Sequence, residues 1–507
     1  MPVLDYMRSV SYTELLNTGT WSIFQPRFVN SVAPCMDACP ASIDMPRVYD
    51  LLRKGEVEQA ALLMLRFNPF PFITGQICPQ FCGESCNRGD LDQPVAIREI
   101  EEWLGGEILD RGILPKPAPF CGKRVLVVGS GPAGLSAAWY LALAGIEVTV
   151  CEREPVAGGM LAWGIPPFRF NRGLLREALK RLEDVGVVVN TSVEITPEEL
   201  RKASQGFNAV LVATGLSKAR VLPQVQPGRR VLLGLEVLKG FNLKGELPHG
   251  TSILVVGGGN VAVDVARVFA RAGRNVTMAC VETRSEMPAI EEEIHQALQE
   301  GVELLCSVGL KEVNEQGGQV AVSMGRVEVV DDSAPLKKVS FVGQTQVGMF
   351  DLVVLAVGQE SRWQWSDGED VVLAGDLATG PSSVAGAFAS GREAARRLIA
   401  EFNGSSYCHL KEEAWERDSS EVVSFNDLNP HNLTLFSHNP LPGGIPREVG
   451  NCLTCGYCNG CGTCWFFCPD ASILLEQPPT LDADHCKGCG ICATECPRGV
   501  VFMRKRG

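Results

Sequence analysis

The sequence has 507 residues, 45% of them hydrophobic and 21% charged, a composition typical of a globular chain rather than a disordered one. Its 46 Lys and Arg against 59 Asp and Glu give a net charge of −13, which excludes a strongly basic nucleic-acid-binding protein. The length predicts several domains, and the 53 glycines favour nucleotide-binding loops over long helices.

The 20 cysteines indicate metal ligation. Five lie between Cys35 and Cys86 and ten between Cys452 and Cys496, mostly at C-x2-C and C-x3-C spacings. Such clustering is typical of metal ligands rather than of a disulfide framework. The sequence therefore predicts a reducing compartment, the cytoplasm.

Residues 1–118 are predicted to form a mostly helical iron–sulfur domain with cysteines in its loops, ending at the proline-rich break 114–119. Five thiols can supply one cubane cluster, but not two without outside ligands. The alternative is that they are reduced structural thiols. The five are Cys35, Cys39, Cys78, Cys82 and Cys86.

Residues 119–250 are predicted to begin a FAD-binding domain with a strand, a glycine turn and a helix. The motif G-x-G-x-x-G stands at Gly129, Gly131 and Gly134. The first glycine allows a tight turn, the second lets backbone approach a pyrophosphate, and the third lets the helix pack on the strand. Glu152 ends the next strand, where it suits a ribose hydroxyl. The alternative is a purely structural turn.

Residues 251–350 repeat this plan and are predicted to bind a nicotinamide nucleotide at Gly257 and Gly259. Glu282 ends the next strand, and its carboxylate would bind the adenosine 2′-hydroxyl and repel a 2′-phosphate. This favours NAD(H) over NADP(H), although Arg284 lies close enough in sequence to offset it. The alternative for Glu282 is a solvated loop charge.

Residues 351–402 are predicted to complete the FAD-binding domain with a strand at 351–357 and a helix from about 383 to 402. Residues 403–447, rich in Asn, Ser, Pro and Gly, predict a long wrapping linker. No membrane span is expected, because the uncharged stretch 125–146 has glycine and proline early, as a buried strand–turn–helix does.

Residues 448–507 contain the bacterial ferredoxin run twice, each ending in Cys-Pro. In two-cluster ferredoxins the fourth cysteine of each run serves the other cluster, and a zinc site is the alternative. We therefore assign one [4Fe–4S] cluster to Cys458, Cys461, Cys464 and Cys496, and the second to Cys486, Cys489, Cys492 and Cys468. Cys452 and Cys455 extend the spacing upstream without an assigned partner.

Together these motifs resemble the family of the glutamate synthase small subunit, whose electron-transfer half also occurs in dihydropyrimidine dehydrogenase. The resemblance spans about residues 35–395 and implies an α/β multidomain fold: a helical iron–sulfur domain, two Rossmann-like domains and a ferredoxin-like α+β domain. The matching segments are 72–79, 158–160, 164–166, 213–215, 286–288, 375–376 and the two glycine loops. Further candidate contacts with the dinucleotides are Pro132, Ala133, Gly159, Met160, Arg169, Ala213, Thr214, Gly215, Asn260, Val261, Gly375, Asp376 and Val384.

The N-terminal cysteines depart from the family pattern C-x2-C-x4-C-x3-C-P. Only its last two cysteines are present, and the earlier positions fall at Arg27 and Asn30, so one of the family's two N-terminal clusters is expected to be missing. The resemblance implies that the other cluster takes Cys39, Cys78, Cys82 and a helical carboxylate, here Glu101. Cys35 and Cys86 are then left over, or one of them replaces Glu101 as a ligand. The alternative for Glu101 is a solvent-exposed residue on the helix surface.

A second departure lies at the nucleotide: NADPH-using relatives carry two arginines where this chain has Val281-Glu282. The expected chemistry is hydride transfer between nicotinamide and flavin, followed by single-electron transfer to about three clusters, with no essential side-chain acid or base.

The added ferredoxin module resembles NAD(P)H:acceptor oxidoreductase subunits of larger anaerobic complexes. We expect a hetero-oligomer whose partner is a 2-oxoacid:ferredoxin oxidoreductase, a sulfite-reductase-type enzyme, another anaerobic reductase or free ferredoxin. Two alternatives stay open: the glutamate synthase small subunit itself, and an electron-transfer scaffold without turnover.

Overall fold

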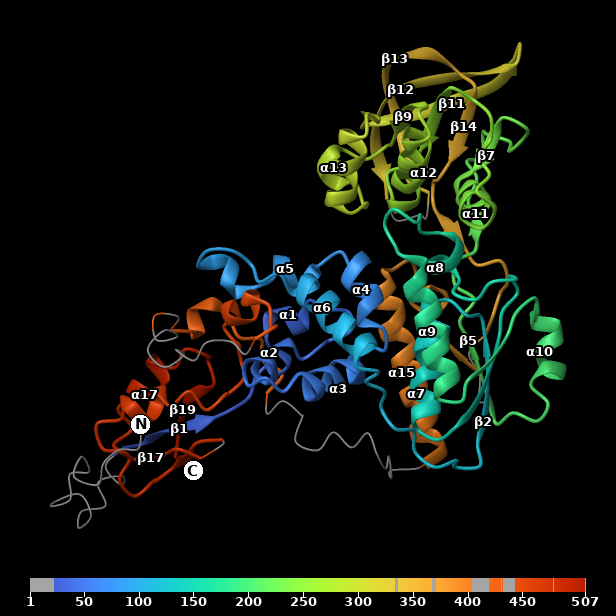
Figure 1. Ribbon diagram of the computed structural model, residues 1–507. Coiled ribbons are helices and arrows are strands. Elements are labelled where there is room, and N and C mark those ends of the chain that lie inside the picture. Colours follow the sequence, from blue (N-terminus) through green and yellow to red (C-terminus); the bar gives the residue numbers. More distant parts are fainter. Residues whose placement is uncertain are drawn as a thin grey trace. The chain divides into compact units, whose positions relative to one another are not determined.

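The computed structural model describes residues 22–332, 336–366, 371–403, 419–429, 431, 443–476 and 478–506. The chain forms two compact units (Figure 1): one joins residues up to 115 with those from 407 onward, and the other comprises residues 116–406. Most of the predicted linker 403–447 lies outside the described residues. In the described part of the chain, no helix is both long and apolar enough to cross a membrane.

The N-terminal part of the first unit is helical. Residues 45–67 form two helices rather than one, because Gly55 turns the chain at a φ of 79°. A Cβ on Gly75 would lie 2.5 Å from the Glu102 backbone, so this glycine lets α4 and α6 pack closely. The elements are α1 (Pro34–Asp37), α2 (Met45–Arg53), α3 (Val57–Phe67), α4 (Pro71–Ile77), α5 (Phe81–Glu84), η3 (Asn87–Asp90) and α6 (Ile97–Asp110).

The first and last described strands pair with each other within this unit. β1 (Phe24–Phe28) runs antiparallel to β19 (Val501–Lys505), and Ser31 N donates to Gly456 O at 2.9 Å. The segment before α1 is therefore part of the C-terminal cysteine module, which the sequence-based division did not foresee. The module's other elements are η5 (Phe425–Asp427), η7 (Arg447–Asn451), α16 (Thr463–Phe466), β17 (Ile473–Leu474), β18 (Thr480–Leu481) and α17 (Ile491–Thr494).

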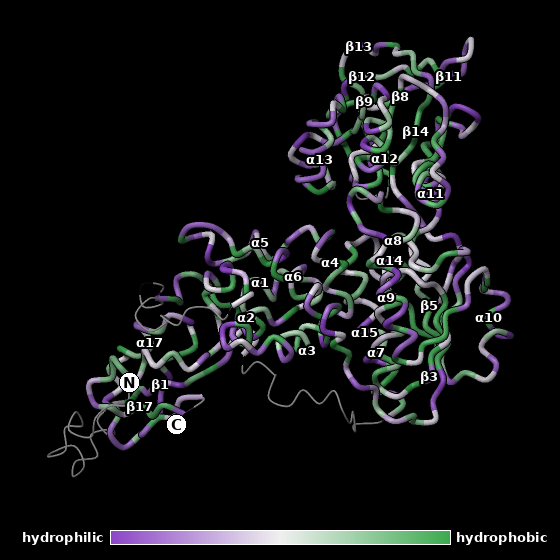
Figure 2. The backbone as a smooth tube through the Cα atoms, viewed as in Figure 1, coloured by the Kyte–Doolittle hydropathy of each residue, from purple (hydrophilic) through white to green (hydrophobic). Residues whose placement is uncertain are grey.

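The second unit contains two five-stranded parallel sheets of the same plan. The first has the order β16-β5-β2-β3-β4, and its central strand β2 leads into α7. Its strands β2 and β5 are almost entirely apolar and buried, as is typical of a parallel sheet, and Figure 2 shows β3 and β5 as hydrophobic. The elements are β2 (Arg124–Val128), α7 (Pro132–Leu143), β3 (Glu147–Cys151), α8 (Met160–Trp163), α9 (Arg172–Asp184), β4 (Val188–Asn190), α10 (Pro197–Ala203), β5 (Ala209–Val212), β16 (Val371–Leu373), α14 (Asp376–Thr379) and α15 (Val384–Asn403).

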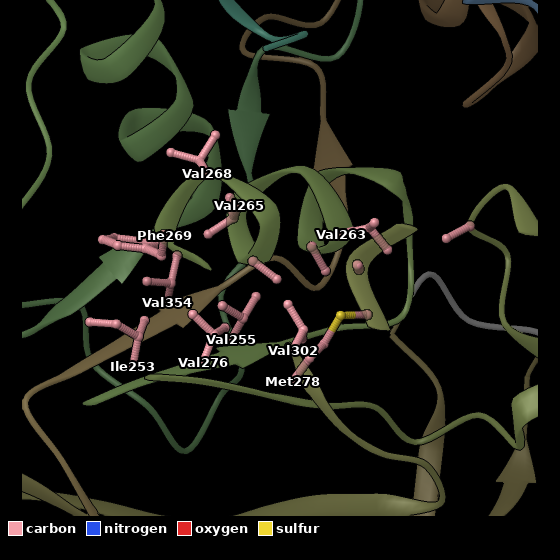
Figure 3. Close-up of a cluster of buried hydrophobic side chains, with 14 of the residues drawn as sticks. Ile253, Val255, Val263, Val265, Val268, Phe269, Val276, Met278, Val302 and Val354 are labelled. Carbon is pink, nitrogen blue, oxygen red and sulfur yellow. The ribbon is translucent and has the colours of Figure 1, made fainter. Parts of the chain in front are cut away.

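The second sheet has the order β10-β9-β8-β14-β7, with β8 leading into α12. Figure 3 shows its core, where Val263 and Phe269 of α12 pack over Ile253 and Val255 of β8. The elements are β7 (Val231–Leu233), α11 (Gly234–Lys244), β8 (Ser252–Val256), α12 (Asn260–Arg271), β9 (Asn275–Ala279), η4 (Arg284–Glu286), α13 (Glu291–Gln299), β10 (Glu303–Leu305) and β14 (Leu352–Leu355).

Two predicted boundaries between these sheets are corrected by the strand pairing. The strand predicted at 351–357 to complete the FAD-binding domain is β14, which pairs with β8 and β7 of the second sheet. β7 (Val231–Leu233) also belongs to the second sheet, although it precedes residue 251, where the nicotinamide-nucleotide domain was predicted to start. A buried apolar strand fits either parallel sheet, so its hydrophobicity does not select its partner. The remaining elements are the antiparallel sheet of β11 (Val308–Gln316), β12 (Gln319–Asp331) and β13 (Lys338–Phe350), and the pair β6 (Lys218–Ala219) and β15 (Gln359–Glu360).

Candidate functional site

The first glycine turn leaves an open cradle at the N-terminus of α7. Gly129 has a φ of 101°, and a Cβ there would lie 2.6 Å from Ala213 O, so the turn accepts only glycine. A Cβ on Gly134 would lie 2.0 Å from Gly129 O, which is why the helix can pack on the strand. By contrast, a Cβ on Gly131 would meet nothing within 4 Å. The backbone is thus free of side chains where a pyrophosphate would sit on the helix N-terminus.

Other predicted FAD residues converge on this cradle. A Cβ on Gly159 would lie 2.7 Å from the Gly131 Cα, and one on Gly375 would lie 2.7 Å from the Ala133 Cβ. The Thr214 hydroxyl is buried and has no hydrogen-bond partner among the described residues. Close backbone approaches around a turn that is free of side chains at Gly131, with an unpartnered hydroxyl nearby, fit a bound dinucleotide. Pro132, Met160, Gly215, Asp376 and Val384 lie on the segments that these contacts bring together.

Glu152 is buried and holds the turn in shape. Its Oε2 accepts hydrogen bonds from Ser130 N (3.0 Å) and Ser130 Oγ (2.6 Å), and its Oε1 accepts one from Glu154 N (2.8 Å). Gly158 N in turn donates to Ser130 Oγ at 2.9 Å. The carboxylate stands at the carboxyl end of β3 beside the cradle, the position predicted for a ribose ligand.

The second glycine turn has the same geometry. Gly257 has a φ of 138°, and a Cβ there would lie 2.2 Å from Ala356 O, whereas one on Gly259 would meet nothing within 4 Å. Asn260 opens α12, and its Oδ1 accepts a hydrogen bond from Ile290 N at 2.9 Å. Val261, which follows it, is partly buried and packs against the core of the second sheet. The open cradle again fits a dinucleotide phosphate.

Glu282 lies beside this second turn. A Cβ on Gly258 would be 2.8 Å from its Oε2, and the residue is 9% exposed, which argues against a solvated loop charge. Lys337 Nζ lies 3.2 Å from Glu282 Oε1, a contact that sequence reasoning missed because the two residues are far apart in the chain. Arg284 instead pairs with Glu291 through both terminal nitrogens, at 2.8 and 2.5 Å.

The side chain of Arg169 is buried in an ion-pair network, and its predicted contact with a cofactor stays a prediction. Its Nη1 lies 2.8 Å from Asp264 Oδ2 and its Nε 2.8 Å from Glu293 Oε1. Burial raises the pKa of Asp264 to about 6, partly offset by Arg169. The network joins the segment after α8 to helices α12 and α13.

We expect Arg169→Leu to destabilise the second unit by about 3–5 kcal/mol, because it leaves buried carboxylates without their partner. Arg284→Leu is the matched control: its partner Glu291 is 76% exposed, so the loss should be about 0–1 kcal/mol. Denaturant unfolding followed by flavin fluorescence measures both. A normal midpoint combined with weakened FAD or NADH binding would show that Arg169 serves the cofactor after all.

The ferredoxin cysteines gather in two groups. Cys468, Cys486, Cys489 and Cys492 line one pocket, so the fourth cysteine of the first run stands with three of the second. The thiols of Cys458, Cys461 and Cys496 lie close enough to Cys464 that, together with its burial, they raise its pKa well above the usual value. Each group contains the four cysteines that the sequence assigned to one cluster. That these cysteines bind a cluster stays a prediction.

The N-terminal group brings Cys39, Cys78 and Cys82 near Glu101. Glu101 is buried in α6, and its Oε1 accepts hydrogen bonds from Thr74 Oγ1 (2.6 Å) and Asn68 Nδ2 (2.6 Å). Burial raises the pKa of Glu101 to about 7, although these two hydrogen bonds oppose the shift. Burial, and then the Glu101 carboxylate, raise the pKa of the Cys78 thiol to about 12.

This environment excludes the solvated alternative for Glu101 and suits a carboxylate ligand. Sequence reasoning did not find Asn68 and Thr74, which fix its orientation; polar side chains in an apolar helical region are the signal that could have found them. Cys35 and Cys86 are nearer to Cys452 and Cys455 in another group of thiols. Among the described residues, no three Cys, His, Asp or Glu side chains are arranged to hold a single metal ion.

Two dinucleotide cradles in one unit and grouped thiols in the other define a class of protein, an oxidoreductase that uses FAD and NAD(P)H and has iron–sulfur domains. The family pattern of pyridine nucleotide-disulphide oxidoreductases matches residues 123–391, and the chain belongs to this family. A second family pattern, described as dihydropyrimidine dehydrogenase domain II with a 4Fe-4S cluster, matches residues 29–112. A third, described as a 4Fe-4S binding domain, matches residues 479–502. The predicted family resemblance and fold class are confirmed.

Three curated relatives show how far the similarity extends. The beta subunit of an NADP(+)-dependent formate dehydrogenase of Moorella thermoacetica is 33% identical over 402 residues, covering 71% of this chain and 56% of the relative. The glutamate synthase (NADPH) small chain of Mycobacterium tuberculosis is 31% identical over 428 residues, covering 73% of this chain and 86% of the relative.

The NAD-dependent dihydropyrimidine dehydrogenase subunit PreT of Escherichia coli O157:H7 is 29% identical over 402 residues, covering 74% of this chain and 92% of the relative. The chain thus spans nearly all of this subunit but only about half of the formate dehydrogenase subunit. The relatives' names include both NAD and NADP.

Proposed function

We propose that this chain is the electron-transfer subunit of a cytoplasmic redox complex and moves electrons between NADH, FAD and [4Fe–4S] clusters. The observation that carries the proposal is the pair of open glycine cradles in one unit of a chain whose other unit gathers cysteines in cluster-sized groups. Bound FAD exchanges two electrons with a nicotinamide and one at a time with a cluster, which no side chain can do.

The chain's own residues bind and align these groups. The N-termini of α7 and α12 offer N–H donors to the two pyrophosphates. Glu152 and Glu282 offer carboxylates to the riboses. Two clusters belong to the ferredoxin module and one to Cys39, Cys78, Cys82 and Glu101.

The preference for NADH rests on Glu282. Its carboxylate faces the turn at Gly258, while Arg284 pairs with the exposed Glu291. Lys337 lies beside Glu282 and compensates part of its negative charge. A carboxylate that accepts a hydrogen bond from the ribose 2′-hydroxyl still favours a hydroxyl over a phosphate at that position.

We therefore expect Glu282→Gln to lower kcat/KM for NADH by about 10- to 100-fold, the loss of one hydrogen bond to a charged group (~1.5–3 kcal/mol), and to leave NADPH no worse. Glu312→Gln, on an exposed strand of the same unit, is the control. Steady-state reduction of a viologen dye with each nucleotide measures both. An unchanged NADH-to-NADPH ratio in Glu282→Gln would remove this residue from nucleotide selection.

The proposed partner is a redox enzyme such as a 2-oxoacid:ferredoxin oxidoreductase or another anaerobic reductase, or free ferredoxin. Anaerobic purification from the native cell, followed by NADH and NADPH reduction of a viologen dye, tests the function. NADH-driven dye reduction and a copurifying reductase subunit support it. Absence of dye reduction with either nucleotide indicates a scaffold, and a copurifying glutamine-amidotransferase subunit indicates glutamate synthase.

A further inference from the structure

Among the residues of the first unit that the structure describes, four cysteines remain outside every cluster assigned so far. Cys35 follows the start of α1, Cys86 precedes η3, and Cys452 and Cys455 form a C-x2-C pair ahead of the ferredoxin runs. More than 360 residues separate Cys86 from Cys452 in sequence, so no spacing motif connects the two pairs.

The structure docks the C-x2-C segment onto the N-terminal loops. Arg53 donates to the Cys452 carbonyl, and Arg88 Nη1 donates to Asn451 O at 3.0 Å. Asn87, next to Cys86, donates from Nδ2 to the Cys455 sulfur at 3.6 Å and to Val423 O at 3.0 Å. Two loops from opposite ends of the sequence are thus held together at their cysteines.

The four thiols share a buried environment. Cys455 is 9% exposed and packs in one apolar cluster with Ala33 and Met36, against which Cys35 also lies. The thiol of Cys35 lies near those of Cys452, Cys455 and Cys86, and the thiol of Cys455 lies near those of Cys452 and Cys86.

Positive and donor groups surround them. Arg498 is 5% exposed; its guanidinium donates to the Leu453 carbonyl, while its Nε has no partner among the described residues. The fully buried Tyr49 hydroxyl is likewise without a described partner, and the pKa of Tyr49 is raised by burial and then by Cys452 and Cys35. A buried guanidinium and unpartnered donors suit an anionic centre held by thiolates.

We propose that Cys35, Cys86, Cys452 and Cys455 hold a further [4Fe–4S] cluster, with two ligands from each end of the chain. Thr454, between the last two cysteines, has a φ of 50° and donates from its backbone N to Cys452 Sγ at 3.3 Å. A sharp turn with N–H donation to a sulfur is the local structure that C-x2-C ligation of a cluster needs.

The site's neighbours give it a place in the electron path. Cys35 is four residues from Cys39, Cys86 is four residues from Cys82, and Cys455 is three residues from Cys458. Its ligand loops are therefore shared with the N-terminal group on one side and with a ferredoxin group on the other. A cluster here connects those two groups, which deepens the proposed electron-transfer function and rests on it.

Iron and acid-labile sulfide in the anaerobically purified full chain test this site. We expect about 16 of each per FAD, against about 12 for three clusters. The double variant Cys452→Ser/Cys455→Ser should lose about four of each, and Cys121→Ser, an exposed thiol of the other unit, should lose none. Cys35→Ser should remove the same electron paramagnetic resonance signal as the double variant.

A count near 12 in the unaltered protein, or one zinc per chain in place of the additional iron, would overturn the proposal. The count in the unaltered protein decides even if the variants fail to fold. FAD content and its bleaching by NADH, recorded on the same samples, report on the proposed function separately.

Discussion

Gly131→Ala is expected to give a folded chain that holds no FAD and no longer reduces a viologen dye with NADH. The residue has a φ of −65° and a ψ of 178°, which alanine adopts without strain, and its Cβ would enter open space. The methyl group would occupy the place where backbone must approach the pyrophosphate. We expect the flavin-to-protein ratio to fall at least tenfold, measured by absorbance after denaturation.

Gly134→Ala is the contrasting variant, because its methyl group would lie 2.0 Å from Gly129 O and disturb the packing of α7 itself. Circular dichroism should be unchanged in Gly131→Ala and altered in Gly134→Ala. Full retention of FAD in Gly131→Ala would mean that the dinucleotide does not lie on this turn.

Gly259→Ala should have the complementary effect, with FAD retained and the response to NADH lost. Its φ of −93° is also open to alanine, and its Cβ would meet no atom within 4 Å. Loss of the helix N-terminal phosphate contact predicts a KM for NADH raised about 100-fold or more, at a cost of about 3 kcal/mol.

Dithionite should still bleach the flavin of Gly259→Ala, because electrons from that reductant do not pass through the nucleotide site. An unchanged KM for NADH would contradict the assignment of the second cradle to the nicotinamide nucleotide. Loss of FAD in this variant would indicate that the two cradles had been assigned in reverse.

The parts that local pattern determines could be predicted from the sequence. Each glycine turn needs its residue types within a few positions, so Gly129 and Gly257 stand at positive φ, as their motifs require. The assignment of Cys468 to the cluster of the second ferredoxin run likewise follows from a short repeat. Its place in one pocket with Cys486, Cys489 and Cys492 agrees with that assignment.

Features that depend on distant pairing were not predictable. β14 is an apolar strand like any other, and only its hydrogen bonds to β8 assign it to the second sheet. The ion pair of Arg169 was not apparent in the sequence, because its carboxylate partner Asp264 lies 95 residues away. Cys452 and Cys455 had no apparent role because their neighbours Cys35 and Cys86 come from the other end of the chain.

The most direct test of the account is an anaerobic titration of the full chain with NADH, followed by flavin absorbance and by electron paramagnetic resonance. If one polypeptide links a hydride donor to one-electron centres, NADH bleaches the flavin and then produces signals of reduced clusters in the same molecules. A protein that is colourless and contains neither flavin nor sulfide, or one whose flavin bleaches while no cluster can be reduced by any donor, would contradict it.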